Sequence, residues 1–70
     1  MKLTVEFERE ADGRWIADVI DLPGVMAYGT TQEEALSSAK ALALRVLAEK
    51  LEHGELSADL PELTFGVVAA

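Results

Sequence analysis

Apolar and polar side chains alternate in the first part of the chain, over residues 2–8. Successive side chains of a strand point to opposite faces, so the alternation predicts a half-buried strand. Its inner face would be formed by Leu3, Val5 and Phe7. Residues 14–20 are rich in aromatic and β-branched side chains, which favour a second strand. Asp12 and Gly13 lie between the two segments and are typical of a hairpin turn, so we expect the strands to pair.

The second predicted strand is apolar on both faces. One face would carry Trp15, Ala17 and Val19, and the other would carry Ile16, Asp18 and Ile20. Such a pattern is typical of a central strand, or of a surface that another protein covers. A Leu-Pro-Gly turn follows, and the short apolar segment 25–28 is expected to complete an antiparallel meander.

A long helix is predicted from about residue 32 to residue 53. Thr31 stands three residues before Glu34, the spacing of a reciprocal N-terminal capping pair, and Gly54 offers a left-handed C-terminal cap. The positions expected to face the sheet are Ala35, Ala39, Leu42, Ala43, Val46 and Leu47. The apolar band is broadened by Leu36, Leu44, Ala48 and Leu51. A helix that is apolar over more than one face tends to bury both, which indicates a partner or a second copy.

Alternation resumes near the end of the chain, where residues 63–68 are predicted to form a last strand. The expected fold is α+β: a three-stranded antiparallel meander, one helix packed across the sheet, and a fourth strand, in the order β-β-β-α-β. We expect a single domain over residues 1–70, with no C-terminal DNA-binding segment.

The length of 70 residues limits how stable a lone copy can be. Domains of this size bury only about 60% of the surface that the unfolded chain exposes. The sequence contains no Cys, so disulfides cannot stabilise the fold. Association with another chain is the remaining common route, and we expect a homo-oligomer, either a dimer or a tetramer.

The formal net charge of −7 argues against direct binding to DNA or RNA, because phosphate recognition needs clustered Lys and Arg. An acidic surface suits a basic protein partner, although it can also serve solubility alone. The N-terminal segment contains no long apolar run, so neither a signal peptide nor a membrane span is predicted. We therefore expect a cytoplasmic protein that does not associate with membranes.

The sequence offers few residues for catalysis, and no enzyme, cofactor or metal site is predicted. The single His, His53, lies in the last helical turn, where it is explained by helix capping. Asp18 and Asp21 could together hold Mg²⁺, but an Asp that opens a turn usually caps the backbone of that turn. Trp15 is assigned to the core beneath the helix, with an interface anchor as the alternative.

The order of these elements resembles the HicB-like antitoxin family of prokaryotic toxin–antitoxin modules. The motifs that carry the resemblance are the turn glycine Gly13, Trp15, the Asp21–Leu22–Pro23–Gly24 turn, Gly29, Thr31 and the Glu33–Glu34–Ala35 helix start. The resemblance covers about residues 2–53. It implies a small α/β domain that binds and neutralises a HicA-like toxin, which cleaves mRNA with a catalytic His.

The resemblance implies that the protein acts by covering the RNA-binding and catalytic surface of the toxin. We expect the partner-binding residues to be Ile16, Asp18, Asp21, Leu22, Pro23 and Gly24. Many members of the family also carry a C-terminal DNA-binding segment, and we expect this chain to lack that segment and to bind no DNA. The alternative is an orphan structural or regulatory homo-oligomer without a toxin partner.

Overall fold

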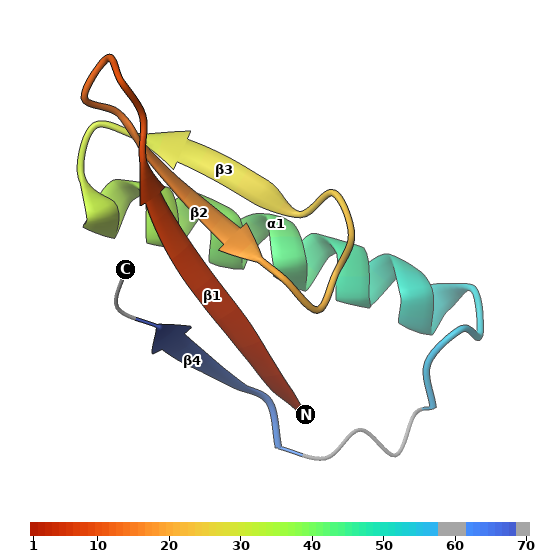
Figure 1. Cartoon of the computed structure of the whole chain (residues 1–70). Helices are drawn as coiled ribbons and strands as arrows, with labels where there is room; N and C mark the ends of the chain where they lie inside the picture. Colours follow the sequence, from red (N-terminus) through yellow and green to blue (C-terminus); the bar gives the residue numbers. More distant parts are fainter. Residues whose placement is uncertain (58–61, 69–70) are drawn as a thin grey trace.

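The protein folds into one layer of strands and one helix, in the predicted order (Figure 1). The computed structural model describes residues 1–57 and 62–68. The elements are β1 (Lys2–Arg9), β2 (Trp15–Val19), β3 (Met26–Gly29), α1 (Gln32–Glu52) and β4 (Thr64–Val68). The expected β-β-β-α-β fold is confirmed, with element ends that differ from the prediction by at most one residue.

The four strands form a mixed sheet in the order β3-β2-β1-β4. The pairs β1–β2 and β2–β3 are antiparallel and form the predicted meander. β4 pairs with β1 in the parallel direction, because the chain returns from the far end of the helix. The sheet therefore has two edges, β3 and β4, that carry no further strand among the described residues.

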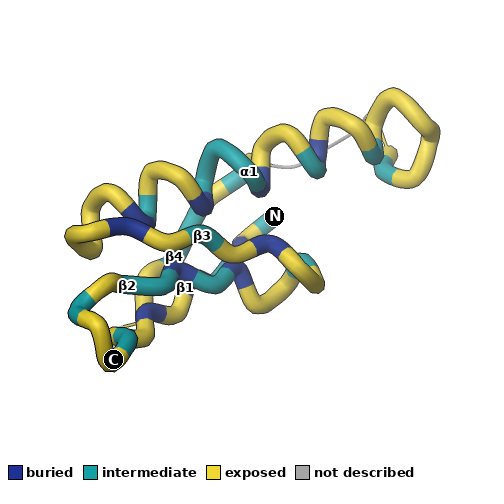
Figure 2. Tube along the Cα trace, turned by 90° about the horizontal axis from the view of Figure 1, so that it is seen from above, coloured by how far each residue is buried: buried dark blue, intermediate teal, exposed yellow. Residues whose placement is uncertain are grey.

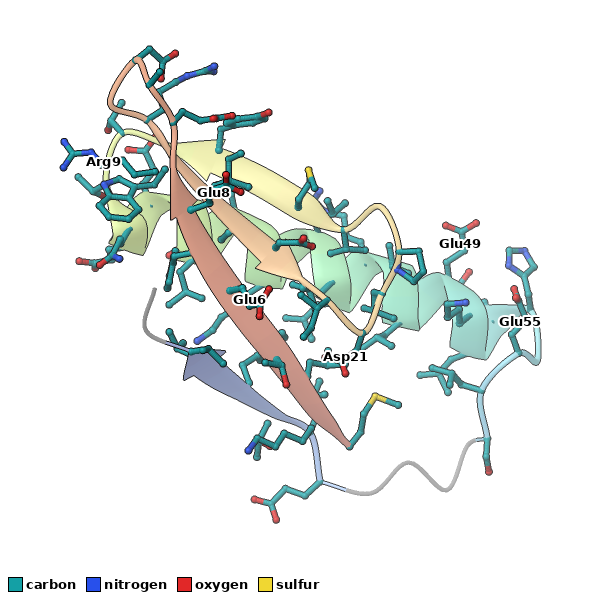
Figure 3. The ribbon with its side chains drawn as sticks, viewed as in Figure 1. Glu6, Glu8, Arg9, Asp21, Glu49 and Glu55 are labelled. Atoms are coloured by element: carbon teal, nitrogen blue, oxygen red, sulfur yellow. The ribbon has the colours of Figure 1, made fainter. Side chains whose placement is uncertain are left out.

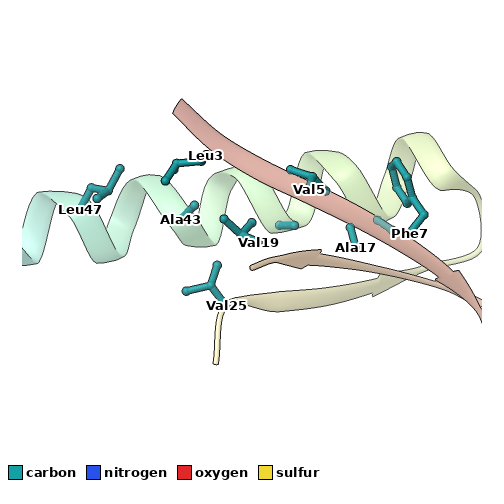
Figure 4. Close-up of a cluster of buried hydrophobic side chains, with 10 residues drawn as sticks. Leu3, Val5, Phe7, Ala17, Val19, Val25, Ala43 and Leu47 are labelled. Carbon is teal, nitrogen blue, oxygen red and sulfur yellow. The ribbon is translucent and has the colours of Figure 1, made fainter. Parts of the chain in front are cut away.

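The hydrophobic core lies between the sheet and the helix (Figure 4). The sheet contributes the predicted inner positions of β1 together with Ala17, Val19 and Val25. The helix contributes Ala35, Ala39, Ala43 and Leu47, which recur once per turn on the side toward the strands (Figure 2). Leu42 and Val46 pack against this core while remaining half-buried, so the predicted sheet-facing side of the helix is confirmed.

Small side chains allow the helix to approach the sheet closely over β2 and β3. Gly29, the last residue of β3, is buried against the first turn of α1. A Cβ atom added to Gly29 would lie only 2.9 Å from the Cα atom of Ala35. The close crossing of β3 and α1 therefore requires glycine at this position, although its φ angle is one that other residues adopt.

Trp15 packs at the end of the core, on the helix side of the sheet, as expected. Its ring meets the ring of Phe7 edge to face, with 6.4 Å between the centroids. The guanidinium group of Arg9 lies 5.3 Å from the centroid of the indole ring. These contacts account for Trp15 as a packing residue that closes the end of the core beside the β1–β2 hairpin.

The start of the helix differs in one detail from the prediction. The Oγ1 atom of Thr31 accepts a hydrogen bond of 3.0 Å from the backbone N–H of Glu34, as expected. The carboxylate of Glu34, however, reaches back to Thr30 instead of Thr31. It accepts from the Thr30 hydroxyl at 3.1 Å and from the Thr30 N–H at 3.4 Å. The expected reciprocal bond to Thr31 is therefore wrong by one residue, because Thr30 offers two donors to the two carboxylate oxygens.

The end of the helix is closed by Gly54, as predicted, with a φ angle of +71°. Its N–H donates to the carbonyl of Leu51, and the N–H of Glu55 donates to the carbonyl of Lys50. These two bonds form the Schellman arrangement and satisfy carbonyl groups that the helix leaves open.

In the part of the chain that the structure describes, no helix has the length and apolar character needed to cross a membrane.

Candidate protein-binding face

Among residues 1–57 and 62–68, the helix covers one side of the sheet and no second element covers the other side (Figure 1). We call this helix-free side the open face. Because side chains alternate along each strand, it is formed by Lys2, Thr4, Glu6, Glu8, Ile16, Asp18, Ile20, Met26, Tyr28, Thr64, Gly66 and Val68. Figure 3 views the sheet from this side, with the helix behind it.

Carboxylates occupy the centre of the open face. Glu6 on β1 is the direct partner of Asp18 on β2, so two acidic side chains stand side by side on neighbouring strands. Glu8 follows on the same face of β1 (Figure 3). Within residues 1–57 and 62–68 the ion pairs are Arg14–Asp12 and Lys50–Glu55, and neither involves these three carboxylates. Like charges in direct opposition destabilise a sheet, so this arrangement costs stability.

Exposed apolar side chains surround the carboxylates. Ile20 is 49% exposed, Met26 is 44% exposed and Tyr28 is 47% exposed. Val68 lies on the same face at the opposite edge strand, β4, where it is the partner of Glu6 and is also exposed. Large apolar side chains grouped on one face of a small protein are typical of interaction surfaces. The open face thus combines a negative centre with an apolar border.

A cation lies at one corner of this face. The guanidinium group of Arg14 stacks over the ring of Tyr28, 4.6 Å from its centroid. The same group binds Asp12, with 2.8 Å between Arg14 Nε and Asp12 Oδ2. The hydrogen bond from the Arg14 backbone N–H, followed by those of its side chain, lowers the pKa of the exposed Asp12 carboxyl. Arg14 is therefore engaged with its own hairpin, and its ion pair is with Asp12 and not with the central carboxylates.

The structure separates the predicted partner-binding residues into three groups. Ile16 and Asp18 lie in the middle of the open face, where both are half-buried. Pro23 and Gly24 are exposed in the β2–β3 loop, beyond the end of the sheet. Leu22 turns toward the hydrophobic core and packs against it.

Asp21 serves as a connection between strands. Its Oδ2 atom accepts a hydrogen bond from the backbone N–H of Thr4 on β1. The neighbouring Ile20 N–H donates to the carbonyl of Thr4 at 3.0 Å and extends the β1–β2 ladder. The expectation that Asp21 caps its own turn is therefore wrong, because a donor on the adjacent strand lies within its reach. The turn itself is closed by bonds between Val19, Leu22 and Val25.

Sequence reasoning did not single out several residues of the open face. Glu6 and Glu8 were recognised only as the outer side of the first strand, and Met26 and Tyr28 only as part of a short strand. The alternation already placed each residue on a face of its own strand. What it lacked was the pairing register, which brings Glu6 against Asp18 and Asp18 against Met26.

Other chemistry is sparse in the part of the chain that the structure describes. No three His, Cys, Asp or Glu side chains gather there as ligands for a metal ion, and no pocket opens among those residues. His53 lies at the exposed C-terminal end of the helix, where its backbone N–H donates to the carbonyl of Glu49.

The fold and this face define a small two-layer α/β protein with one uncovered, acidic and partly apolar sheet surface. No family model, curated protein or solved structure matches the chain.

Proposed function

We propose that the protein is an antitoxin-like binding module that neutralises a HicA-type mRNA-cleaving toxin by covering its RNA-binding and catalytic surface. The proposal rests on the resemblance of the motifs between Gly13 and Ala35 to HicB-like antitoxins. The single structural observation that supports it is the open face, with Glu6, Glu8 and Asp18 at its centre and exposed apolar side chains around them.

Electrostatics and surface character both favour such a partner. A protein that binds RNA carries clustered Lys and Arg to neutralise phosphates. These same cations would find carboxylates on the open face, which attract them over distance and align them on contact. The apolar border, which includes Ile20, Met26 and Tyr28, would exclude water from the charged centre and supply the area that holds the complex together.

The proposed mechanism is steric and electrostatic and needs no catalysis by this chain. Glu6 and Asp18 would bind the cationic side chains of the toxin that otherwise bind RNA phosphates. RNA and this protein would therefore compete for one surface of the toxin. Access of the substrate to the catalytic His of the toxin is blocked in the complex. Since both the toxin and its mRNA substrate would be intracellular, the proposal places the protein in the cytoplasm.

The proposal is tested by mixing the purified protein with the small basic toxin encoded beside its gene and measuring RNA cleavage. Cleavage should cease near an equal molar ratio, and a complex should appear on a sizing column. Binding should weaken as salt rises, because exposed charges are screened. Undiminished cleavage without a complex would contradict the proposal.

Charge reversal locates the binding surface. Asp18→Lys should weaken toxin binding at least tenfold, about 1.4 kcal/mol, because a cation would then face the cationic surface of the toxin. Glu49→Lys is the matched control, since Glu49 is an exposed residue of the helix on the opposite side of the sheet (Figure 3). Equal losses in the two variants would argue against the open face and for a general effect of net charge.

A second candidate function is an orphan structural or regulatory homo-oligomer. The observation that favours it is the exposure of Leu44 and Leu51 on the helix, away from the open face. A genome that encodes no small basic protein beside this chain would favour this second candidate.

A further inference from the structure

Within the described residues, the edge of the sheet formed by β4 carries none of the features that usually protect a sheet edge. Natural edge strands are blocked by charged side chains, proline, bulges or a covering element. β4 (Thr64–Val68) contains no charged residue and no proline. Val67 and Val68 point to opposite sides of the sheet, and they are 51% and 46% exposed. The edge is therefore open to pairing with another strand.

The backbone of β4 offers a defined set of hydrogen-bonding groups to such a strand. The N–H of Thr64 donates to the carbonyl of Met1, so the peptide groups of Thr64 point toward β1. Successive residues of a strand direct these groups to alternate sides, so those of Gly66 and Val68 also point toward β1. The N–H and C=O groups of Phe65 and Val67 consequently point away from the sheet.

We propose that a second copy of this chain pairs with this edge, so that two β4 strands run antiparallel around a twofold axis at Gly66. In this register Phe65 faces Val67 of the second copy, and Val67 faces Phe65 of that copy. Each such pair exchanges two hydrogen bonds through the outward groups of the two residues. The edge is thus complementary to itself, as a twofold interface requires.

The side chains fit the same register. Phe65 and Val67 both lie on the helix side of the sheet, so each cross-strand pair joins an aromatic and a β-branched side chain, a favourable combination. Gly66 meets its own counterpart at a non-hydrogen-bonded position, where the Cα atoms of two strands approach to about 4.5 Å. A glycine without a Cβ atom suits this closest point.

The self-complementary register identifies a second copy as the occupant. Two chains of net charge −7 repel each other over most of their surface. Beside β4 the nearby ionic groups include two cations: the side chain of Lys2 lies against Gly66, and Lys40 Nζ lies 5.4 Å from the centroid of the Phe65 ring. The opposite edge, β3, has four residues, whereas β4 has five. β4 is therefore the longer of the two edges and offers more backbone groups to a second copy.

The proposed dimer has a consequence for the open face. A twofold axis perpendicular to the sheet leaves the open faces of both copies on the same side of one continuous sheet. The dimer would therefore present two acidic faces next to each other. This dimer stands independently of the toxin partnership, and its test uses the isolated chain.

Sedimentation of the full chain at micromolar concentration tests the dimer. The wild-type protein should sediment at twice the chain mass of 7.5 kDa. Val67→Pro should be monomeric, because it removes an N–H that points away from β1 and would bond to the second copy. Val67→Lys should also be monomeric, because it places a charge on the edge. Ile20→Lys adds the same charge at a similarly exposed position of the open face and should remain dimeric.

Circular dichroism establishes that each variant is folded, so that a monomer reflects a lost interface. A register test follows from the Gly66 contact. In a mixture of isotope-labelled and unlabelled wild-type chains, a filtered nuclear Overhauser effect should connect the Hα atoms of Gly66 in the two copies. A monomeric wild-type chain, or a dimer that persists in both folded Val67 variants, would overturn the proposal.

Discussion

At the scale of single residues, glycines and carboxylates hold the most specific roles. Gly29 permits β3 to cross the first helical turn closely, whereas Gly24 is needed for its φ angle of +82° and has open space around it. The two positions thus need glycine for different reasons: a steric contact with backbone at Gly29 and a left-handed conformation at Gly24.

Replacement of these two glycines separates the two reasons. Gly29→Ala should lower the free energy of unfolding by about 3 kcal/mol, because the helix must move away from the sheet to admit the methyl group. Gly24→Ala should cost about 1 kcal/mol, the price of a left-handed conformation in a residue with a Cβ atom. Urea unfolding measures both values. A Gly29→Ala protein as stable as Gly24→Ala would contradict the close crossing.

The pKa of the Asp12 carboxyl provides a second test at this scale. The backbone N–H of Arg14 is the largest cause that lowers this pKa below 3.8, so Arg14→Gln should leave it below that value. The folded-state pKa of Asp12 lies below its unfolded-state pKa, so the ionised carboxylate stabilises the fold above pH 3.8. This stabilisation disappears as the pH falls through the folded-state pKa. Titration of the Asp12 side chain by NMR measures the midpoint. A midpoint of 3.8 in Arg14→Gln would assign the effect to the side chain instead.

At the scale of elements, the helix is defined by local capping at both ends and by tertiary contacts along one side. Thr31 satisfies the N–H of Glu34, and the Schellman bonds around Gly54 satisfy the last carbonyls. The side that faces the sheet is built mainly from alanines, which bring the helix close but bury little area each. The caps therefore carry a substantial share of the stability of this element.

The two threonines before the helix should differ in their contribution. Thr31→Ala removes the acceptor of the Glu34 N–H and should cost about 1 kcal/mol. Thr30→Ala removes an exposed hydroxyl donor to the Glu34 carboxylate but keeps the backbone N–H, and should cost about 0.5 kcal/mol. Urea unfolding of both variants at neutral pH measures the difference. A larger loss for Thr30→Ala would show that the bond between Thr30 and Glu34 is the dominant cap.

At the scale of the whole molecule, the acidic residues Glu6, Glu8 and Asp18 lie together on a sheet face that no second element covers among the described residues. Glu6 and Asp18 face each other without a counter-ion among the described residues, in a chain whose net charge is −7. An arrangement that costs stability is typical of a surface selected for binding. Stability and binding should therefore respond to Asp18 in opposite directions.

Asp18→Asn should raise the free energy of unfolding by about 0.5 kcal/mol at low salt, because it removes a like-charge pair across two strands. The gain should shrink as salt rises, since exposed charges are screened. Glu33→Gln is the control and should slightly lower stability, because a carboxylate is favourable in the first turn of a helix. Chemical unfolding at two salt concentrations measures both. A loss of stability in Asp18→Asn would mean that the carboxylate makes a favourable contact.

The sequence by itself determined the features that depend on short-range chemistry. Alternation predicted the strands, and the turn glycines Gly13 and Gly54 marked the ends of elements, because their conformations are dictated locally. It also placed Ile16 and Asp18 on one face of their strand. These parts of the fold follow from the preferences of neighbouring residues, so no knowledge of distant contacts was needed.

Only the tertiary structure decided which distant segments meet. It placed β4 parallel to β1 and set Glu6 beside Asp18. It also packs Leu22 against the core and places the carboxylate of Asp21 where it accepts a hydrogen bond from the N–H of Thr4. Strand order and register result from the packing of the helix against the whole sheet. Because that packing sums contacts between residues far apart in the chain, no local pattern could reveal the open face or the free edge.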